Sequence, residues 1–207
     1  MSSSARSAAL PASNGRSDAK RDAIVRGAKA VFLKHGFEST SMDMVALHAG
    51  VSKMTVYRHF GSKEALFAGV ITDLCERVAD GNLLEIFELP PREALTTFAR
   101  KMIAIVFAHE TVELHRIVIA ESRRFPKLGR LFYQSGPEAC IAALATYFDR
   151  HVGDARFKVR NPRREAEEFL ELLRGYAHLR VLLGLERAPS EAQMEERIEG
   201  AIRHVLN

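Results

Sequence analysis

The sequence predicts an all-α protein, with a small N-terminal domain of three helices joined to a larger helical domain. Apolar residues recur at helical spacing, and no segment shows the alternation typical of a strand. Glycine and proline divide the chain into pieces of single-helix length, and no internal repeat is found. With 207 residues, 47% of them hydrophobic and 27% charged, the chain can bury one sizeable core and a smaller second one.

Residues 1–16 are rich in serine and alanine and contain no long apolar stretch. We therefore expect a disordered tail there rather than a signal peptide. No other run is apolar and long enough to span a bilayer, which predicts a cytoplasmic protein without a membrane partner. Cys75 and Cys140 lie in different predicted helices without metal-ligand spacing, which predicts reduced thiols and leaves a redox role open.

The positive charge of the chain is concentrated near its N-terminus. Residues 1–63 hold ten Lys or Arg and four Asp or Glu, a net charge of +6, whereas the whole chain carries +4 and the remainder therefore −2. Phosphate contacts supply most of the non-specific affinity of proteins for DNA, and a basic module on a nearly neutral body suits that role. A merely solvated basic face is the alternative interpretation.

The N-terminal domain, residues 17–63, begins with a helix from about Ser17 or Asp18 to His35. A second helix follows between Thr40 and Gly50, where Thr40 is the expected N-cap and Asp43 completes a turn like a capping box. The apolar stripe of the first helix is Ile24, Ala28, Val31 and Phe32, and the small residues of the second, which allow close approach of a neighbouring helix, are Ala46 and Ala49.

Residues 51–60 are expected to form a DNA recognition helix. Ser52 is a suitable N-cap and Gly61 a suitable C-terminal glycine, with Val56 and Phe60 four residues apart on the buried face. Two short helices joined by a tight turn at residues 50–52 have the sequence form of a helix-turn-helix. Lys53, Met54 and Thr55 are candidates to read bases, Tyr57, His59 and Lys63 to bind phosphates, and Arg58 for either role; Thr40 and Ser41 complete the expected DNA contacts.

The C-terminal domain, residues 64–207, is expected to hold the remaining helices. The first, residues 63–80 with Ser62 as cap, is long enough to connect the two domains mechanically. Pro91 fits the first position of a helix that is apolar almost all round and hence buried. The predicted segments are a short apolar piece at 83–89 and helices at 91–109, 113–124, 127–134, 137–151, 162–183 and 190–206.

Motifs typical of enzymes and metal sites are missing from the sequence. It has no Gly-x-Gly, no Gly-x-Ser-x-Gly and no Gly-Lys-Ser/Thr, so nucleotide-binding and α/β-hydrolase chemistry lack their characteristic turns. His109 and His115 are six residues apart, whereas a zinc helix needs a spacing of four. His109 and Glu113 have that spacing, but Thr111 looks like a cap that separates two helices. We therefore expect neither an enzyme nor a metal or other cofactor.

Residues 40–66 resemble the N-terminal signature of TetR-family transcriptional regulators. The resemblance is carried by Ala46 and by residues 49–52, 55–57, 59–60 and 62–66. A second segment, residues 115–137, resembles the regulatory domain of the AefR-like branch of that family. The resemblance implies an all-helical domain for effector binding and dimerisation after the helix-turn-helix domain.

The C-terminal domain offers candidates for both of these roles. Apolar and aromatic walls with few polar groups are typical of a pocket for a small hydrophobic molecule, and the candidates are Met102, Phe107, Phe132, Tyr133 and His178. The last two helices are apolar enough to form half of a four-helix bundle between subunits, as the resemblance implies. The candidates there are Phe169, Leu173, Tyr176, Ile198, Ile202 and Val205. The alternative is that these apolar faces serve only the core of their own subunit.

These observations predict a homodimeric regulator whose helix-turn-helix units bind successive major grooves of a pseudo-palindromic double-stranded DNA operator. We expect a repressor that a small hydrophobic effector releases; an activator with the same binding mode is a further alternative that the sequence leaves open. The alternative from another class is an α-helical carrier of small molecules whose basic end is incidental.

Overall fold

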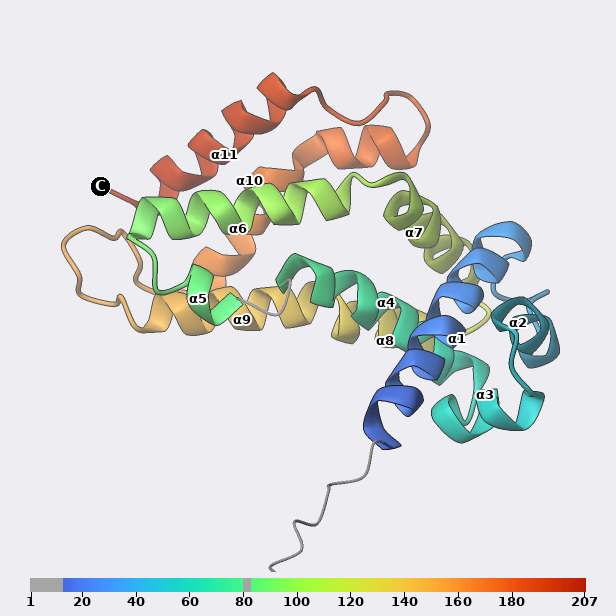
Figure 1. Ribbon diagram of the computed structural model, residues 1–207. Helices are drawn as coiled ribbons and strands as arrows, with labels where there is room; N and C mark the ends of the chain where they lie inside the picture. The colour runs from blue at the N-terminus through green and yellow to red at the C-terminus, as the bar shows by residue number, and fades with distance from the viewer. Residues whose placement is uncertain (1–12, 80–82) are drawn as a thin grey trace, which may run out of the picture.

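The computed structural model describes residues 13–79 and 83–207, and their architecture is entirely helical (Figure 1). No strand forms within these residues, although Phe157 and Leu206 make an isolated antiparallel bridge. The predicted all-α fold is therefore confirmed. The helices are α1 (Ser13–His35), α2 (Met42–Ala49), α3 (Lys53–Phe60), α4 (Lys63–Ala79), α5 (Leu83–Ile86), α6 (Pro91–Val106), α7 (His109–Glu121), α8 (Pro126–Ser135), α9 (Pro137–Asp149), α10 (Pro162–Leu182) and α11 (Glu191–Val205).

Several helix ends differ from the sequence prediction. Helix α1 begins four residues before Ser17, and the rest of the expected tail, residues 1–12, lies outside the described residues, as do residues 80–82. Helix α7 begins at His109, so Thr111 is a buried residue of its first turn and not a cap. The Thr111 interpretation was wrong because Ala108, with its extended backbone, already precedes the helix.

The N-terminal domain is held together by aromatic packing around α1. The ring of Phe32 lies 5.1 Å from that of Phe67 and 5.8 Å from that of Phe37, and all three side chains are fully buried. Gly27 of α1 has no side chain, and a Cβ placed there would lie 3.1 Å from the Cβ of Ala49. Ala49 therefore sets a close contact between α1 and the end of α2, which fixes the turn of the helix-turn-helix against α1.

The C-terminal domain packs α6, α9, α10 and α11 around one apolar core. Phe98, Phe148 and Phe169 are at most 1% exposed at its centre, and the Tyr147 ring stacks on Phe87 at 4.5 Å. Figure 1 shows this group at one end of the molecule and α1 to α3 at the other, with α4, α7 and α8 between them.

The two domains share a continuous contact. Leu114 and Val118 of α7 and Leu128 of α8 belong to the same buried cluster as the core of the N-terminal domain. Polar contacts border it: Lys29 Nζ lies 2.5 Å from Glu110 Oε2, and Arg124 forms an ion pair with Glu38. The N-terminal domain thus rests on α7 and α8 and not on α4 alone.

Helix α10 is kinked at Gly175. Its backbone there has φ 49° and ψ −164°, a left-handed conformation that only glycine adopts without strain. A Cβ at this position would also lie 2.8 Å from Nη1 of Arg197. The kink divides α10 into residues 162–174, which contribute to a cavity, and residues 176–182.

None of the described helices is both long and apolar enough to cross a membrane.

Candidate functional site

The helix-turn-helix is defined by two capped helices. Ser41 and not Thr40 is the N-cap of α2, because the Ser41 hydroxyl accepts a hydrogen bond from the Met44 N–H at 3.2 Å. Thr40 is only 3% exposed and donates its hydroxyl to the Gly36 carbonyl at 2.7 Å. The Thr40 side chain therefore makes an internal contact, and the expectation that it contacts DNA is corrected. Gly50 ends α2 with φ 65°, and Ser52 caps α3 as predicted.

The outer face of α3 carries most of the predicted DNA contacts. Val56 is buried against α4 and α2, which turns Lys53, Met54, Tyr57 and Arg58 outward. Met54 is 76% exposed, an unusual fraction for a large apolar side chain. Thr55 and His59 are half-buried, and Ser41 is exposed beside them at the start of α2; the Thr55 hydroxyl lies 2.8 Å from that of Ser52.

Lys53 is tied to α2. Its Nζ donates to Asp43 Oδ2 at 2.9 Å, a contact that joins the two helices of the motif, and this hydrogen bond raises the pKa of Lys53. Asp43 was expected only in a capping turn, and its pair with Lys53 was not predicted because the two residues are ten positions apart.

Lys63 serves the fold in this structure. Its Nζ donates to the carbonyl oxygens of Phe37, Glu38 and Thr40 at 2.7, 2.9 and 2.9 Å, and these bonds use all three N–H groups of the ammonium. The ammonium also lies 4.7 Å from the centre of the Phe37 ring, and burial lowers the pKa of Lys63. The expected phosphate contact of Lys63 is therefore corrected: this side chain holds the α1–α2 connection.

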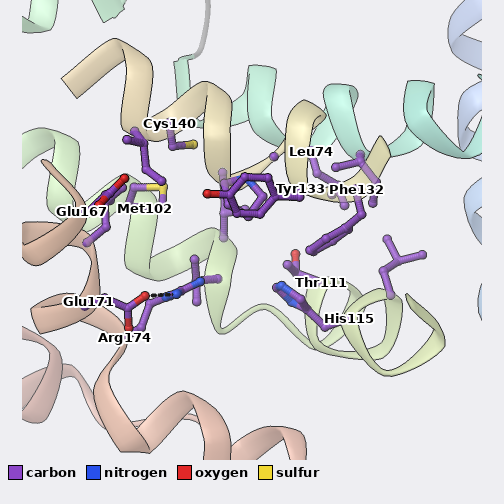
Figure 2. A pocket seen from close by; sticks show the side chains of 18 residues that line it. Leu74, Met102, Thr111, His115, Phe132, Tyr133, Cys140, Glu167, Glu171 and Arg174 are labelled. Atoms are coloured by element: carbon purple, nitrogen blue, oxygen red, sulfur yellow. Dashed lines mark hydrogen bonds and ion pairs between the residues drawn. The ribbon is translucent and has the colours of Figure 1, made fainter. Parts of the chain in front are cut away.

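The C-terminal domain encloses a cavity of about 570 Å³ (Figure 2). Helices α4, α6, α7, α8, α9 and α10 all contribute to its lining, which is mainly apolar. Met102, Phe132 and Tyr133, three of the five predicted ligand contacts, line it. The size and the mainly apolar walls are those of a site for a small organic molecule.

The other two predicted ligand contacts lie elsewhere. His178 lines a second cavity of about 290 Å³, which shares His115, Glu171 and Arg174 with the first. Phe107 borders neither cavity and packs behind His178, with 5.7 Å between the ring centres. The prediction for Phe107 is therefore wrong, because this side chain turns into the core at the end of α6.

Sequence reasoning missed Thr111 and His115. They are four residues apart and share one face of α7, a spacing that could have drawn attention to them had α7 been predicted to begin at His109. Figure 2 shows both on the same side of the cavity, below Phe132, with the Glu171–Arg174 ion pair at its other end. The mainly apolar wall therefore has two polar parts, one at the end near α7 and one at the Glu171–Arg174 ion pair.

The histidines near this polar end are held neutral. Burial, helped by the nearby His178 and Arg174, lowers the pKa of His115 from 6.5 to about 4. Burial and the charge of Arg174 likewise lower the pKa of His178 to about 4. At neutral pH both imidazoles therefore offer one donor and one acceptor and carry no charge.

Most of the predicted dimer contacts are buried inside the chain. Phe169, Leu173, Ile198, Ile202 and Val205 are at most 1% exposed and belong to the core of the C-terminal domain, so the prediction is wrong for these five. Their large apolar side chains fill the space between α10, α11, α6 and α9. Tyr176, the sixth, is 79% exposed and continues an outward apolar face of α10 formed with Leu172, Leu179 and Leu183.

A polar group near the C-terminus has ligand-like spacing. One ligand atom each of Glu165, Glu168 and His204 lies within 4.8 Å of the others. His204 Nε2 is 3.0 Å from Glu168, which also accepts a hydrogen bond from Arg164 at 2.8 Å. These contacts form a surface ion-pair network that ties α10 to α11, and we assign it a structural role.

Comparison with known proteins agrees with this geometry. Residues 24–70 match the TetR family of bacterial regulatory proteins, and residues 93–207 match the C-terminal domain of AefR-like transcriptional repressors. The HTH-type transcriptional regulator RutR of Escherichia coli is 31% identical over 138 residues, or 67% of this chain, which spans only 56% of that relative.

Two solved structures are similar over most of their length. A TetR-family transcriptional regulator from Mesorhizobium loti has a TM-score of 0.75 and 29% identity, with 91% of this chain and 95% of that one covered. The flavonoid-responsive regulator FrrA has a TM-score of 0.66 and 38% identity, with 91% and 94% covered. The alternative of a carrier protein is therefore set aside: the chain belongs to the TetR family of DNA-binding transcriptional regulators and carries an AefR-like C-terminal domain.

Proposed function

We propose that this regulator is a repressor that a small aromatic effector releases from its operator. The observation that carries the proposal is that the cavity and the DNA-binding domain have wall residues in common. Ile71, Leu74 and Leu114 line the cavity and also belong to the buried cluster of the N-terminal domain. A molecule that displaces these side chains changes how α1 and α4 pack against the cavity wall. The position of α3 changes with them.

The size and chemistry of the cavity support an aromatic effector. Phe132, Tyr133 and Met102 provide aromatic and thioether surfaces, which pack well against flat rings. FrrA, whose name describes it as flavonoid-responsive, is 38% identical to this chain. We therefore propose a compound of flavonoid size as the class to test.

On the DNA side, we propose that Lys53, Met54 and Thr55 contact bases, and that Ser41, Tyr57, Arg58 and His59 contact the phosphate backbone, with Arg58 also within reach of bases. Two copies are needed because a single short recognition helix reads few bases. We propose that the second copy packs on the apolar face of α10 formed by Leu172, Tyr176, Leu179 and Leu183. The dimer acts in the cytoplasm, where its operator lies.

The test is a titration of operator binding with and without effector. An operator is selected from random DNA with the full-length protein, labelled, and followed by fluorescence anisotropy while flavone is added. We expect the operator affinity to fall about 5- to 150-fold, the range of a typical allosteric coupling. Filling the cavity by Met102→Trp should preserve DNA binding and abolish the response.

Ile119→Trp is the matched control, because Ile119 is 63% exposed on α7 and its enlargement leaves the cavity unchanged. The control should respond to flavone as the native protein does. If flavone binds in the cavity and saturates it while the operator affinity stays constant, release by this class of effector is refuted.

A further inference from the structure

We propose that the effector is an uncharged aromatic compound bearing a hydroxyl group, and that Thr111, His115 and His178 form the site that recognises this hydroxyl. The inference rests on the proposed function, since it specifies the chemistry of the same cavity. The three residues are referred to below as the hydroxyl site.

The hydroxyl site lies where α7 meets α10. The ring centre of His115 is 4.6 Å from that of Phe132 and 5.0 Å from that of His178, and both contacts are edge-to-face. Thr111 is one turn before His115 on the cavity side of α7. Because His115 borders both cavities, a group held by it can reach His178 as well.

Three buried polar atoms of this site lack partners. Thr111 is 8% exposed and His178 7%, and the Thr111 Oγ1, the His115 Nδ1 and the His178 Nε2 have no hydrogen-bond partner among the described residues. Leaving such atoms unsatisfied is costly, and buried polar groups are paired in the great majority of cases. A ligand hydroxyl both donates and accepts, so one such group can satisfy a threonine hydroxyl and an imidazole nitrogen together.

The walls beside the hydroxyl site favour an aromatic body. Phe132 stands directly against His115, and Tyr133 follows it on α8. Met102 lies across the cavity from them in Figure 2. A flat ring between these side chains would make aromatic contacts on one side and a sulfur contact on the other.

The charges around the cavity disfavour an anion. The described lining residues include two carboxylates, Glu167 and Glu171, and a single permanent cation, Arg174. Arg174 forms an ion pair with Glu171, while Glu167 lies 3.2 Å from Arg163 outside the lining. The histidines stay neutral, so a bound carboxylate would lose its water shell without gaining a free counter-charge among these residues.

Isothermal titration of the full-length protein with three compounds tests the inference. The compounds are a monohydroxylated flavone, the unsubstituted flavone and a flavone carboxylate of matching size. The hydroxyl is placed at the 3′ position of the flavone, where it is not conjugated with the carbonyl, so it keeps its proton near neutral pH as a tyrosine phenol of pKa about 10 does. We expect the hydroxylated compound to bind about tenfold more tightly than flavone, and the carboxylate more weakly than both.

Variants of the hydroxyl site test whether its residues cause the preference for the hydroxylated compound. Thr111→Val keeps the shape of the side chain and His178→Phe keeps the ring, and each should abolish the preference for the hydroxyl while flavone affinity stays within about twofold. Thr146→Val is the matched control, because it removes the hydroxyl of an exposed threonine on α9 that lines neither cavity, and it should keep the preference. Thermal unfolding in the absence of ligand checks that each variant is folded.

Equal binding of the hydroxylated and unsubstituted compounds would overturn the inference, as would tightest binding by the carboxylate, loss of the preference in Thr146→Val, or no binding at all. Anisotropy of the labelled operator in the same samples separates this result from the proposed function. If flavone releases DNA without any preference for the hydroxyl, only the inference fails. If the hydroxylated compound binds selectively and the operator stays bound, only the release mechanism fails.

Discussion

Replacing Leu114 by alanine should weaken both the folded state and the coupling between cavity and DNA-binding domain. The side chain is fully buried, packs in the cluster of the N-terminal domain and also lines the cavity. Three lost carbon atoms at about 0.8 kcal/mol each remove about 2.4 kcal/mol of hydrophobic stabilisation. Incomplete collapse of the vacated space adds to this loss, so we expect about 3 kcal/mol, within the usual range of about 2–5 kcal/mol for such truncations.

For a chain of this size, about 3 kcal/mol corresponds to a fall in melting temperature of about 6–12 °C. Calorimetry of Leu114→Ala against the native protein measures it. Ile119→Ala on the same helix is the control, since Ile119 is 63% exposed and its truncation should change stability by at most about 0.5 kcal/mol. The effector-induced drop in operator affinity should also shrink in Leu114→Ala. A variant with native stability and a native effector response would refute the shared-wall mechanism.

Three further changes have defined outcomes. Asp43→Asn should free the Lys53 ammonium of each copy to contact bases, so operator affinity should rise by about 1 kcal/mol per copy, and an unchanged affinity would contradict this. Between pH 6.5 and 4 the unfolded chain binds more protons at His115 and His178 than the folded chain, so the free energy of unfolding should fall as the pH is lowered through this window. The fall should be less steep in the double variant with both histidines replaced by phenylalanine. Urea midpoints that depend on pH identically in the two proteins would disprove this. Leu179→Glu should shift the sedimentation of the protein to that of a monomer, unless the second copy packs elsewhere.

The helix-turn-helix could be predicted from sequence because its signals are local. Ser52 caps the helix that directly follows it, and Gly61 ends that helix eight residues later, so both contacts are fixed by short stretches of chain. The caps of α4 and α11, Ser62 and Ser190, are local in the same way. The role of Lys63 was missed because its partners are more than twenty positions away and only the folded chain brings them together.

The dimer face and the cavity could not be predicted in the same way. Helix α10 is apolar on two sides, and periodicity alone does not tell which side meets its own core; Phe169 and Leu173 proved internal and Tyr176 external. The cavity is a space left between side chains of six helices, and its position depends on how completely the side chains fill the space where two helices meet. Phe107 and His178 are neighbours in space, yet only one of them reaches a cavity.

The kink at Gly175 also affects how mutations can change this protein. Before the kink, Glu167, Leu170, Glu171 and Arg174 line the first cavity, while Leu172 faces outward; after it, His178 lines the second cavity, while Tyr176 and Leu183 face outward. Because Gly175 interrupts the regular helical backbone between the two halves of α10, a substitution that slightly rotates one half does not rotate the other half. Since each half carries both cavity-lining and outward residues, the kink allows the ligand contacts of one half to change while the side chains of the other half keep their directions.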